Sequence, residues 1–293
     1  MPQSRSERIA SVAIYCILTV ITLLVLYPLY FVLIASFSAP ETVMRGEVWL
    51  WPKEWSFVGY ERLFANSEIG RGFLNTLLYT AAGTSLNLLM TIAAAYPLSR
   101  ADFTGRGVFT LIIVFTMFFS GGMIPNYLLI KELGMLDSFW VMIIPTAVSV
   151  WNILIMRTFF QSSIPKELQE AAFIDGCSNM RVLLRIVLPL SGPILAVMVL
   201  FYAVGHWNSY FNAMIYLSSR DNYPLQLFLR EILVQGQMQE MVDISDDSLA
   251  RSLMDAEAIK YAAVIVTNLP MLMLYPFLQK YFVKGVMIGS IKG

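Results

Sequence analysis

Six long stretches of this chain contain no charged side chain, and they restrict its fold more than any other feature. They cover residues 9–40, 72–99, 107–130, 138–156, 186–219 and 261–279. The shortest of them has 19 residues, close to the roughly 20 that a helix needs to cross about 30 Å of hydrocarbon. Inside lipid every backbone polar group must find a partner, and a helix satisfies this by itself. We therefore predict an all-α, polytopic membrane protein with six transmembrane helices.

The composition agrees with a membrane protein, because charged residues make up 14% of the chain, against about 25% in soluble domains. The first run follows Arg5 and Arg8, as in a signal peptide. Its 32 charge-free residues exceed a signal core and show no obvious small-residue cleavage site, so we expect a retained span. Cys16 and Cys177 suggest no disulfide framework. A net charge of zero gives no reason to expect nucleic acid as a partner.

The distribution of charge sets the expected orientation. We place the spans at about 10–37, 72–98, 107–130, 136–160, 191–217 and 258–283, with a helical loop at 161–189 and a long loop at 218–257. An even number of spans puts both termini on one side. With the termini inside, the inner segments hold 11 basic and 5 acidic residues, as the positive-inside rule requires. We therefore expect the termini and the 161–189 loop in the cytoplasm, and the 218–257 loop outside.

The stretch from Pro165 to Pro189 has the pattern of two short helices. Pro165 suits a first helical turn, and Gly176 can end that helix in a left-handed conformation. Ser178 can cap a second helix, which Pro189 stops or kinks. Taken alone, the pattern is better explained by a solvated helical loop between two membrane spans.

A motif inside this stretch resembles that of one known family. Glu170-Ala171-Ala172, Gly176, Ile186 and Leu188-Pro189 stand at the spacing EAA-x3-G-x9-I-x-LP, the EAA motif of ABC-importer permeases. In that family the loop forms a coupling helix that docks on a cytoplasmic ATPase. The resemblance implies that Glu170 meets a basic residue there. The residues that it implies for coupling are Glu170, Ala171, Ala172, Asp175, Gly176, Arg181 and Arg185.

The resemblance covers essentially the whole chain and implies the fold of type I ABC-importer permeases, in the maltose-type carbohydrate group. It places this chain in the inner membrane and implies four partners: a second homologous permease subunit, an ABC ATPase dimer, an extracytoplasmic solute-binding protein and membrane lipid. The sequence has no G-x4-GK[ST] loop, so we expect ATP and Mg on the ATPase, and neither a cofactor nor enzymatic activity here. Residues 118–140 and 282–293 resemble the branch that imports oligosaccharides and polysaccharides, including aldouronate and alginate.

The fifth expected span has the most polar middle, with flat aromatic faces and amides that suit sugar rings. The candidate substrate path consists of Tyr202, His206, Trp207, Asn208, Tyr210 and Asn212, with Trp151 and Asn152 from the fourth span. Polar side chains in a span face a bundle interior or a wet cavity. Hydrogen bonding between helices with ordinary packing therefore explains the set equally well, and for His206 alone it is the better explanation.

Other functions stay open at this point. A secondary transporter or channel would act without ATP or a partner, but the span centres contain no Lys, Arg, Asp or Glu for proton or sodium coupling. An ABC importer for a non-sugar solute, such as an amino acid or phosphate, is a further alternative. An acidic sugar would need a positive group from the partner subunit. The sequence offers no metal-ligand spacing and no Ser-His-Asp arrangement.

Overall fold

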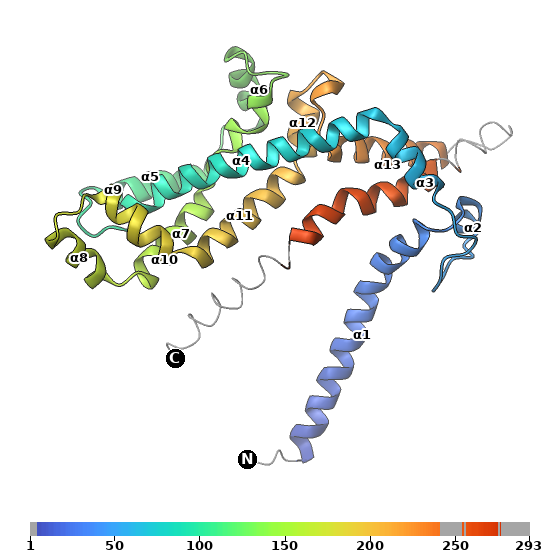
Figure 1. Ribbon diagram of the computed structural model, residues 1–293, viewed down its shortest axis with the longest axis horizontal. Coiled ribbons are helices and arrows are strands. Elements are labelled where there is room, and N and C mark those ends of the chain that lie inside the picture. Colours follow the sequence, from blue (N-terminus) through green and yellow to red (C-terminus); the bar gives the residue numbers. More distant parts are fainter. Residues whose placement is uncertain (1–4, 241–253, 255, 275, 277–293) are drawn as a thin grey trace. The chain divides into compact units, whose positions relative to one another are not determined.

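The structure, a computed structural model, describes residues 5–240, 254, 256–274 and 276 (Figure 1). Regular structure in these residues is helical, as the sequence predicts. The middle of the 218–257 loop, the end of the sixth expected span and residues 282–293 lie outside the described residues. The chain folds as two compact units, one from residues 1–69 and 229–269, the other from residues 70–228 and 270–293.

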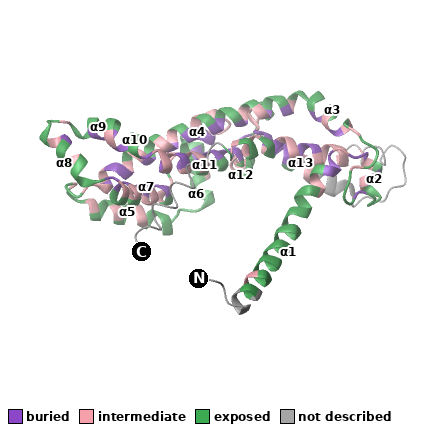
Figure 2. Ribbon diagram, turned by 60° about the horizontal axis from the view of Figure 1, so that its bottom comes forward, coloured by how far each residue is buried: buried purple, intermediate pink, exposed green. Residues whose placement is uncertain are grey.

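The first unit contains one helix of membrane length that is apolar on all sides. Its helices are α1 (Arg5–Ala35), α2 (Pro40–Met44), α3 (Val58–Ala65), the larger part of α13 (Leu225–Glu240) and most of the helix Ala256–Leu274. The apolar part of α1, Ala10–Ala35, has 26 residues and extends about 39 Å at 1.5 Å per residue. It is exposed along nearly its whole length (Figure 2). A helix in water would keep a polar face, so α1 requires an apolar environment.

Aromatic side chains fix the segment that follows α1. The hydroxyls of Tyr27 and Tyr30 donate to the carbonyls of Trp49, at 3.4 Å, and of Leu50. Trp49 itself is 68% exposed. Gly59 lies where two helices of this unit meet. A Cβ added at Gly59 would lie 2.9 Å from the carbonyl carbon of Ala258, so glycine permits the close approach of α3 and the helix Ala256–Leu274.

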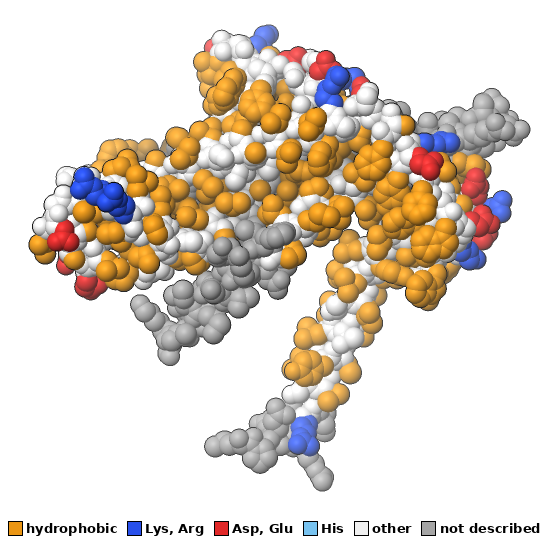
Figure 3. Space-filling model, viewed as in Figure 1, with side chains coloured by type: hydrophobic (Ala, Val, Ile, Leu, Met, Phe, Trp, Pro, Cys, Tyr) orange, Lys and Arg blue, Asp and Glu red, His pale blue; other side chains and the backbone are white. Residues whose placement is uncertain are grey.

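The second unit is a helical bundle around α4, which is the longest helix described. Its α-helices are α4 (Ser67–Ser99), α5 (Arg106–Phe118), α6 (Met123–Glu132), α7 (Val150–Ser163), α8 (Lys166–Ile174), α9 (Asn179–Val182), α10 (Leu188–Leu190), α11 (Gly192–Trp207), α12 (Tyr210–Tyr216) and the start of α13 (Leu225–Glu240). Short helical turns are η1 (Phe139–Met142), η2 (Ile144–Thr146), the π-helical η3 (Leu183–Val187) and η4 (Arg220–Asn222). Side chains from α4, α7 and α11 form the core, and Ala95, Met156 and Met198 are fully buried. Hydrophobic side chains are also spread over the face in Figure 3, whereas the charged ones lie in a few groups, as expected of a chain surrounded by lipid.

Two of the six expected spans are bent rather than straight, and a third bend lies where the fifth expected span begins. The angle is 109° between α5 and α6, 53° between Phe139–Thr146 and α7, and 83° between Asn179–Leu190 and α11. In the described residues, three single helices are long and apolar enough to cross a membrane, and the count reaches six if each bent pair is one span. The interruption of the 107–130 span lies at residues 119–122, where Gly122 has a φ of +87° that suits glycine.

One loop carboxylate joins two connections of the second unit. Asp137 lies between α6 and η1 with a φ of +54°, and its Oδ1 accepts from the backbone N–H groups of Ser218 and Ser219 at 3.1 and 3.0 Å. The side-chain amide of Asn222 donates to the Asp137 carbonyl at 3.0 Å. The carboxylate therefore fixes how the segment after α12 lies beside η1.

Candidate functional site

The EAA loop, residues 161–189, begins with a helix whose end is closed by two backbone hydrogen bonds. Pro165 takes the N-cap position of α8 with a ψ of 133°, so the prediction that it lies in the first helical turn is wrong by one residue. At the other end Gly176 has a φ of +73°. Its N–H donates to Phe173 O at 3.0 Å, and the N–H of Cys177 donates to Ala172 O at 2.9 Å. This pair of bonds is the Schellman motif, which glycine forms without steric cost.

The left-handed conformation at Gly176 gives a direct prediction. Gly176→Val should destabilise the loop by about 1–2 kcal/mol, the cost of a left-handed L-residue, whereas Gly176→Asn should cost less because asparagine tolerates this region. A Cβ at this position would have nothing within 4 Å, so the difference reports the backbone and not a collision. Thermal unfolding of the purified chain in detergent measures it. Equal losses for both variants would contradict this reading of the helix end.

The second helix of the loop differs from its expected form. Ser178 occupies the N-cap position of α9 but makes no side-chain capping hydrogen bond, so the predicted cap is absent. The helix then passes through the π-helical η3 and α10, with Pro189 in the first turn of α10. It ends at Leu190, where the chain turns by 83° into α11. A π-turn, which is rare and concentrates at functional sites, therefore lies inside the EAA motif.

The residues expected to couple divide into one buried residue and an exposed set. Ala172 is 7% exposed and belongs to the core with Phe160 and Val182. The exposed residues of the expected coupling set are Glu170, Ala171, Asp175, Gly176, Arg181 and Arg185. Two apolar side chains that the motif does not include, Ile174 and Met180, are 86% and 63% exposed. Each of the two stands two residues from a buried residue, Ala172 or Val182, and therefore on the opposite side of its short helix. This spacing is the sequence pattern that could have indicated them.

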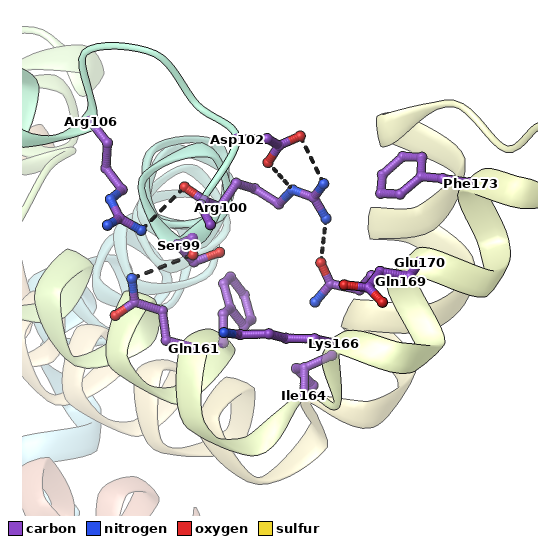
Figure 4. Close-up of a pocket in the computed structure, with 12 residues that line it drawn as sticks. Ser99, Arg100, Asp102, Arg106, Gln161, Ile164, Lys166, Gln169, Glu170 and Phe173 are labelled. Atoms are coloured by element: carbon purple, nitrogen blue, oxygen red, sulfur yellow. Dashed lines mark hydrogen bonds and ion pairs between the residues drawn. The ribbon is translucent and has the colours of Figure 1, made fainter.

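A cavity of about 350 Å³ separates α8 from the turn between α4 and α5 (Figure 4). Arg100, one residue after α4, crosses it. Its guanidinium donates to both oxygens of Asp102 at 2.9 Å, donates to the Gln169 side chain on α8, and lies 4.7 Å from the ring centroid of Phe173. The hydrogen bond from Arg100 lowers the pKa of the Asp102 carboxyl, and the same bond raises the pKa of the arginine. Both groups therefore stay charged, and the turn after α4 is bonded to α8.

The sequence did not indicate the role of Arg100, because Arg100 and its partner Gln169 are 69 positions apart.

A second cavity, of about 460 Å³, lies among α4, η2, α7, α11 and α12. Four residues of the candidate substrate path line it: Asn152, Tyr202, His206 and Asn212. The sequence did not indicate the polar residues Asn87, Thr146, Ser149 and Ser209, which line it as well. Asn87 could have been found from α4, where Thr76, Thr80, Thr84, Asn87 and Thr91 recur every three or four residues on one buried face.

The other four candidates of the substrate path do not line this cavity. Trp151 is 59% exposed, and Tyr210 is 41% exposed with its ring edge-on to Phe211. Trp207 is 1% exposed and packs edge-on against Phe73. Asn208 is exposed, and its amide donates to Val204 O at 3.0 Å and accepts from Gln226 at 3.2 Å. The aromatic part of the expected path is therefore dispersed. The cavity wall combines amides and hydroxyls with apolar side chains such as Met142 and Phe201.

Two of the cavity residues are also bonded to α4. The Asn87 amide donates to Thr146 O at 2.6 Å, so its Oδ1 accepts from Nε2 of His206, also at 2.6 Å. This fixes the histidine tautomer with its proton on Nε2. The Tyr202 hydroxyl pairs with Thr91 Oγ1 at 2.6 Å. Hydrogen bonding between helices, the simpler explanation of these polar residues, therefore holds for His206 and Tyr202, which line the cavity at the same time. No group of three His, Cys, Asp or Glu residues that could hold a metal ion occurs in the part of the chain that the structure describes.

Known proteins similar to this chain share its whole length, although no protein-family model matches it. It is 40% identical to the polygalacturonan/rhamnogalacturonan transport system permease protein YtcP of Bacillus subtilis, over 98% of this chain and 99% of that protein. In the crystal structure of a bacterial ABC transporter involved in the import of the acidic polysaccharide alginate, one chain is 33% identical, with a TM-score of 0.87 over 96% of this chain and 99% of that one. A bacterial alginate ABC transporter in complex with alginate pentasaccharide-bound periplasmic protein shares the fold, at 16% identity and a TM-score of 0.54 over 93% of both chains.

Proposed function

Because this chain belongs to the permease subunits of carbohydrate ABC importers, we propose that it forms half of the membrane path for an acidic oligosaccharide or polysaccharide. The family predicted from the EAA motif is confirmed, and its members are transport subunits rather than enzymes. Permeases of ABC importers work with an ATPase and a solute-binding protein. In our proposal a second homologous permease and an ATPase dimer, which binds ATP and Mg, complete the transporter.

The identity to the polygalacturonan/rhamnogalacturonan permease carries the proposed substrate class. Polygalacturonan and alginate are both chains of sugar acids, and their permeases are 40% and 33% identical to this chain. The amides, hydroxyls and imidazole of the 460 Å³ cavity offer partners for sugar hydroxyls. No Lys or Arg is among the described residues that line the cavity, so a partner subunit must supply the positive charge for a carboxylate. Asn152 and Asn212 are the residues that we assign to substrate contact, since Asn87 already bonds His206.

The EAA loop is proposed to meet the ATPase on the cytoplasmic side of the inner membrane, with both termini on that side. The excess of basic residues in the inner segments supports this orientation, 11 against 5 acidic ones. The exposed surface of the loop supports the docking role, because Glu170 and the 86% exposed Ile174 are four residues apart and lie on one side of α8. An acidic side chain next to an exposed apolar one suits a protein groove with a basic side chain.

Reconstitution into proteoliposomes with the partner subunits tests the proposal. We expect uptake of oligogalacturonides to need ATP and the solute-binding protein, and Asn152→Leu and Asn212→Leu to lower it about tenfold, the value of one hydrogen bond. Trp151→Leu, on the exposed face of the same helix, is the matched control and should retain uptake. Uptake without ATP would support a secondary transporter or channel, and preference for a non-sugar solute would contradict the substrate class.

The same vesicles test the orientation. A cysteine at position 174, in a chain with Cys16 and Cys177 replaced by alanine, should react with a membrane-impermeant maleimide only from the side that binds the ATPase. Ile174 is 86% exposed, so the thiol is accessible once the ATPase is removed. Labelling from the opposite side would rule out the docking role of the EAA loop.

A further inference from the structure

Helix α8 is attached to the rest of the chain by two bent connections. Before it, Pro165 is extended, with a ψ of 133°. After it, Gly176 has a φ of +73°, and the chain passes through the π-turn and an 83° bend before it reaches α11. Neither connection continues the axis of α8 into a membrane helix. A movement of α8 therefore needs some other contact to reach the cavity in a defined direction.

Arg100 provides such a contact, and it comes from the end of α4. Its side chain is 16% exposed although it carries a full charge. Two hydrogen bonds to Asp102 hold the guanidinium plane, the same plane covers the Phe173 ring, and a further N–H reaches Gln169. Gln169 and Phe173 are four residues apart, so they lie on one side of α8. Because the planar guanidinium group contacts two successive turns of α8, it fixes the rotation of this helix about its axis as well as its position.

The neighbouring contacts join the end of α4 to the flanks of the EAA loop. Arg157 donates to Leu98 O at 3.0 Å from α7, and Gln161 donates to Ser99 O at 3.4 Å. On the other side, the Tyr96 hydroxyl donates to Asn179 O at 3.4 Å. These bonds hold α7 and α9, whereas the bonds of Arg100 reach α8 itself (Figure 4).

The same helix, α4, forms a wall of the 460 Å³ cavity. Asn87, which bonds His206 there, precedes Ser99 by 12 residues on one continuous helix, or about 18 Å at 1.5 Å per residue. Pro97 is the proline inside α4 and lies in its last turn, so the segment between Asn87 and that turn has no proline. A helical segment of this length moves as one body. Asn87 at one end of the segment contacts His206 in the cavity, and Arg100, directly after the other end, contacts α8.

We propose that Arg100 is the positioning residue that locks α8 to α4, so that α8 and the cavity wall move together. The inference rests on the proposed function, in which α8 meets the ATPase. The apolar contacts of Ala172 hold α8 against the bundle, and Arg100 sets its rotation. Arg100→Gln should leave α8 docked but able to rotate, so ATP hydrolysis continues while less substrate is moved per ATP.

Distances between spin labels test the lock within this chain. The labels are placed at Ile174→Cys on α8 and Leu89→Cys on α4, which are 86% and 66% exposed, with the natural cysteines replaced by alanine. We expect a narrow distance distribution in the parent chain and a broad one in Arg100→Gln. Arg100→Lys should give an intermediate one, because lysine keeps the charge but lacks the planar guanidinium group. Arg106→Gln is the matched control, since Arg106 donates to Arg100 O and not to α8; it should keep the narrow distribution.

The assembled transporter tests the consequence of the lock. The ratio of sugar taken up to ATP hydrolysed should fall about tenfold in Arg100→Gln, as expected when one charge-assisted contact is lost. An unchanged distance distribution, or an unchanged ratio, overturns the proposal. If the parent chain binds no ATPase, the proposed function fails, and the distances still decide whether Arg100 holds α8.

Discussion

Glu170→Lys is expected to abolish sugar uptake while the chain still inserts into the membrane. Glu170 is exposed on α8, so the substitution removes nothing from the core. In the proposed complex it replaces an attraction to a basic ATPase residue by a repulsion, and like charges at an interface cost several kcal/mol. We therefore expect the affinity for the ATPase to fall on the order of 10³-fold, measured by co-purification and by uptake in proteoliposomes.

A charge reversal elsewhere on the chain controls for this result. Glu132→Lys lies at the exposed end of α6 and makes the same change of two charges away from the EAA loop. It should retain ATPase binding and uptake. Normal uptake and normal co-purification in Glu170→Lys would show that Glu170 has no coupling role in this chain, even though it matches the EAA motif.

Gly83→Ala is expected to destabilise the bundle, although it adds one methyl group to a helix. A Cβ at position 83 would lie 2.7 Å from Nδ1 of His206 and closer to other atoms of the ring. The imidazole must then move, and the buried bond between His206 and Asn87 breaks. Overpacking costs about 1–3 kcal/mol, and an unpaired buried amide adds about 1–3 kcal/mol. Thermal unfolding in detergent should show the loss directly.

Two further variants show whether the loss in Gly83→Ala comes from the collision with His206 or from a change in helix propensity. Gly70→Ala is on the same helix, and its added Cβ would meet nothing within 4 Å, so it should be neutral or stabilising. In a double mutant, His206→Ala removes the ring with which the methyl group added at position 83 would collide. The losses of the two single mutants should therefore sum to more than the loss in the double mutant. Equal effects of alanine at positions 70 and 83 would show that the close approach of α4 and α11 is not required.

The polar residues of the bundle show where sequence patterns stop being informative. Asn87, His206, Thr91 and Tyr202 were each visible as polar residues in apolar runs, but their pairing joins positions more than 100 apart. No local pattern specifies which polar side chains meet. Trp207 illustrates the reverse, because an aromatic residue expected on the substrate path is buried against Phe73.

The sequence by itself determined the class of the protein and the positions of its apolar segments and of the EAA loop along the chain. These follow from local chemistry: the absence of charge over the width of a bilayer, and glycine at the left-handed position that closes α8. Only the tertiary structure decided which spans bend, which candidates line the cavity, and that Arg100 joins α4 to α8. The physical reason is distance along the chain. A local rule fixes what a segment prefers, whereas a cavity or a side-chain contact between helices exists only when packing brings remote residues together.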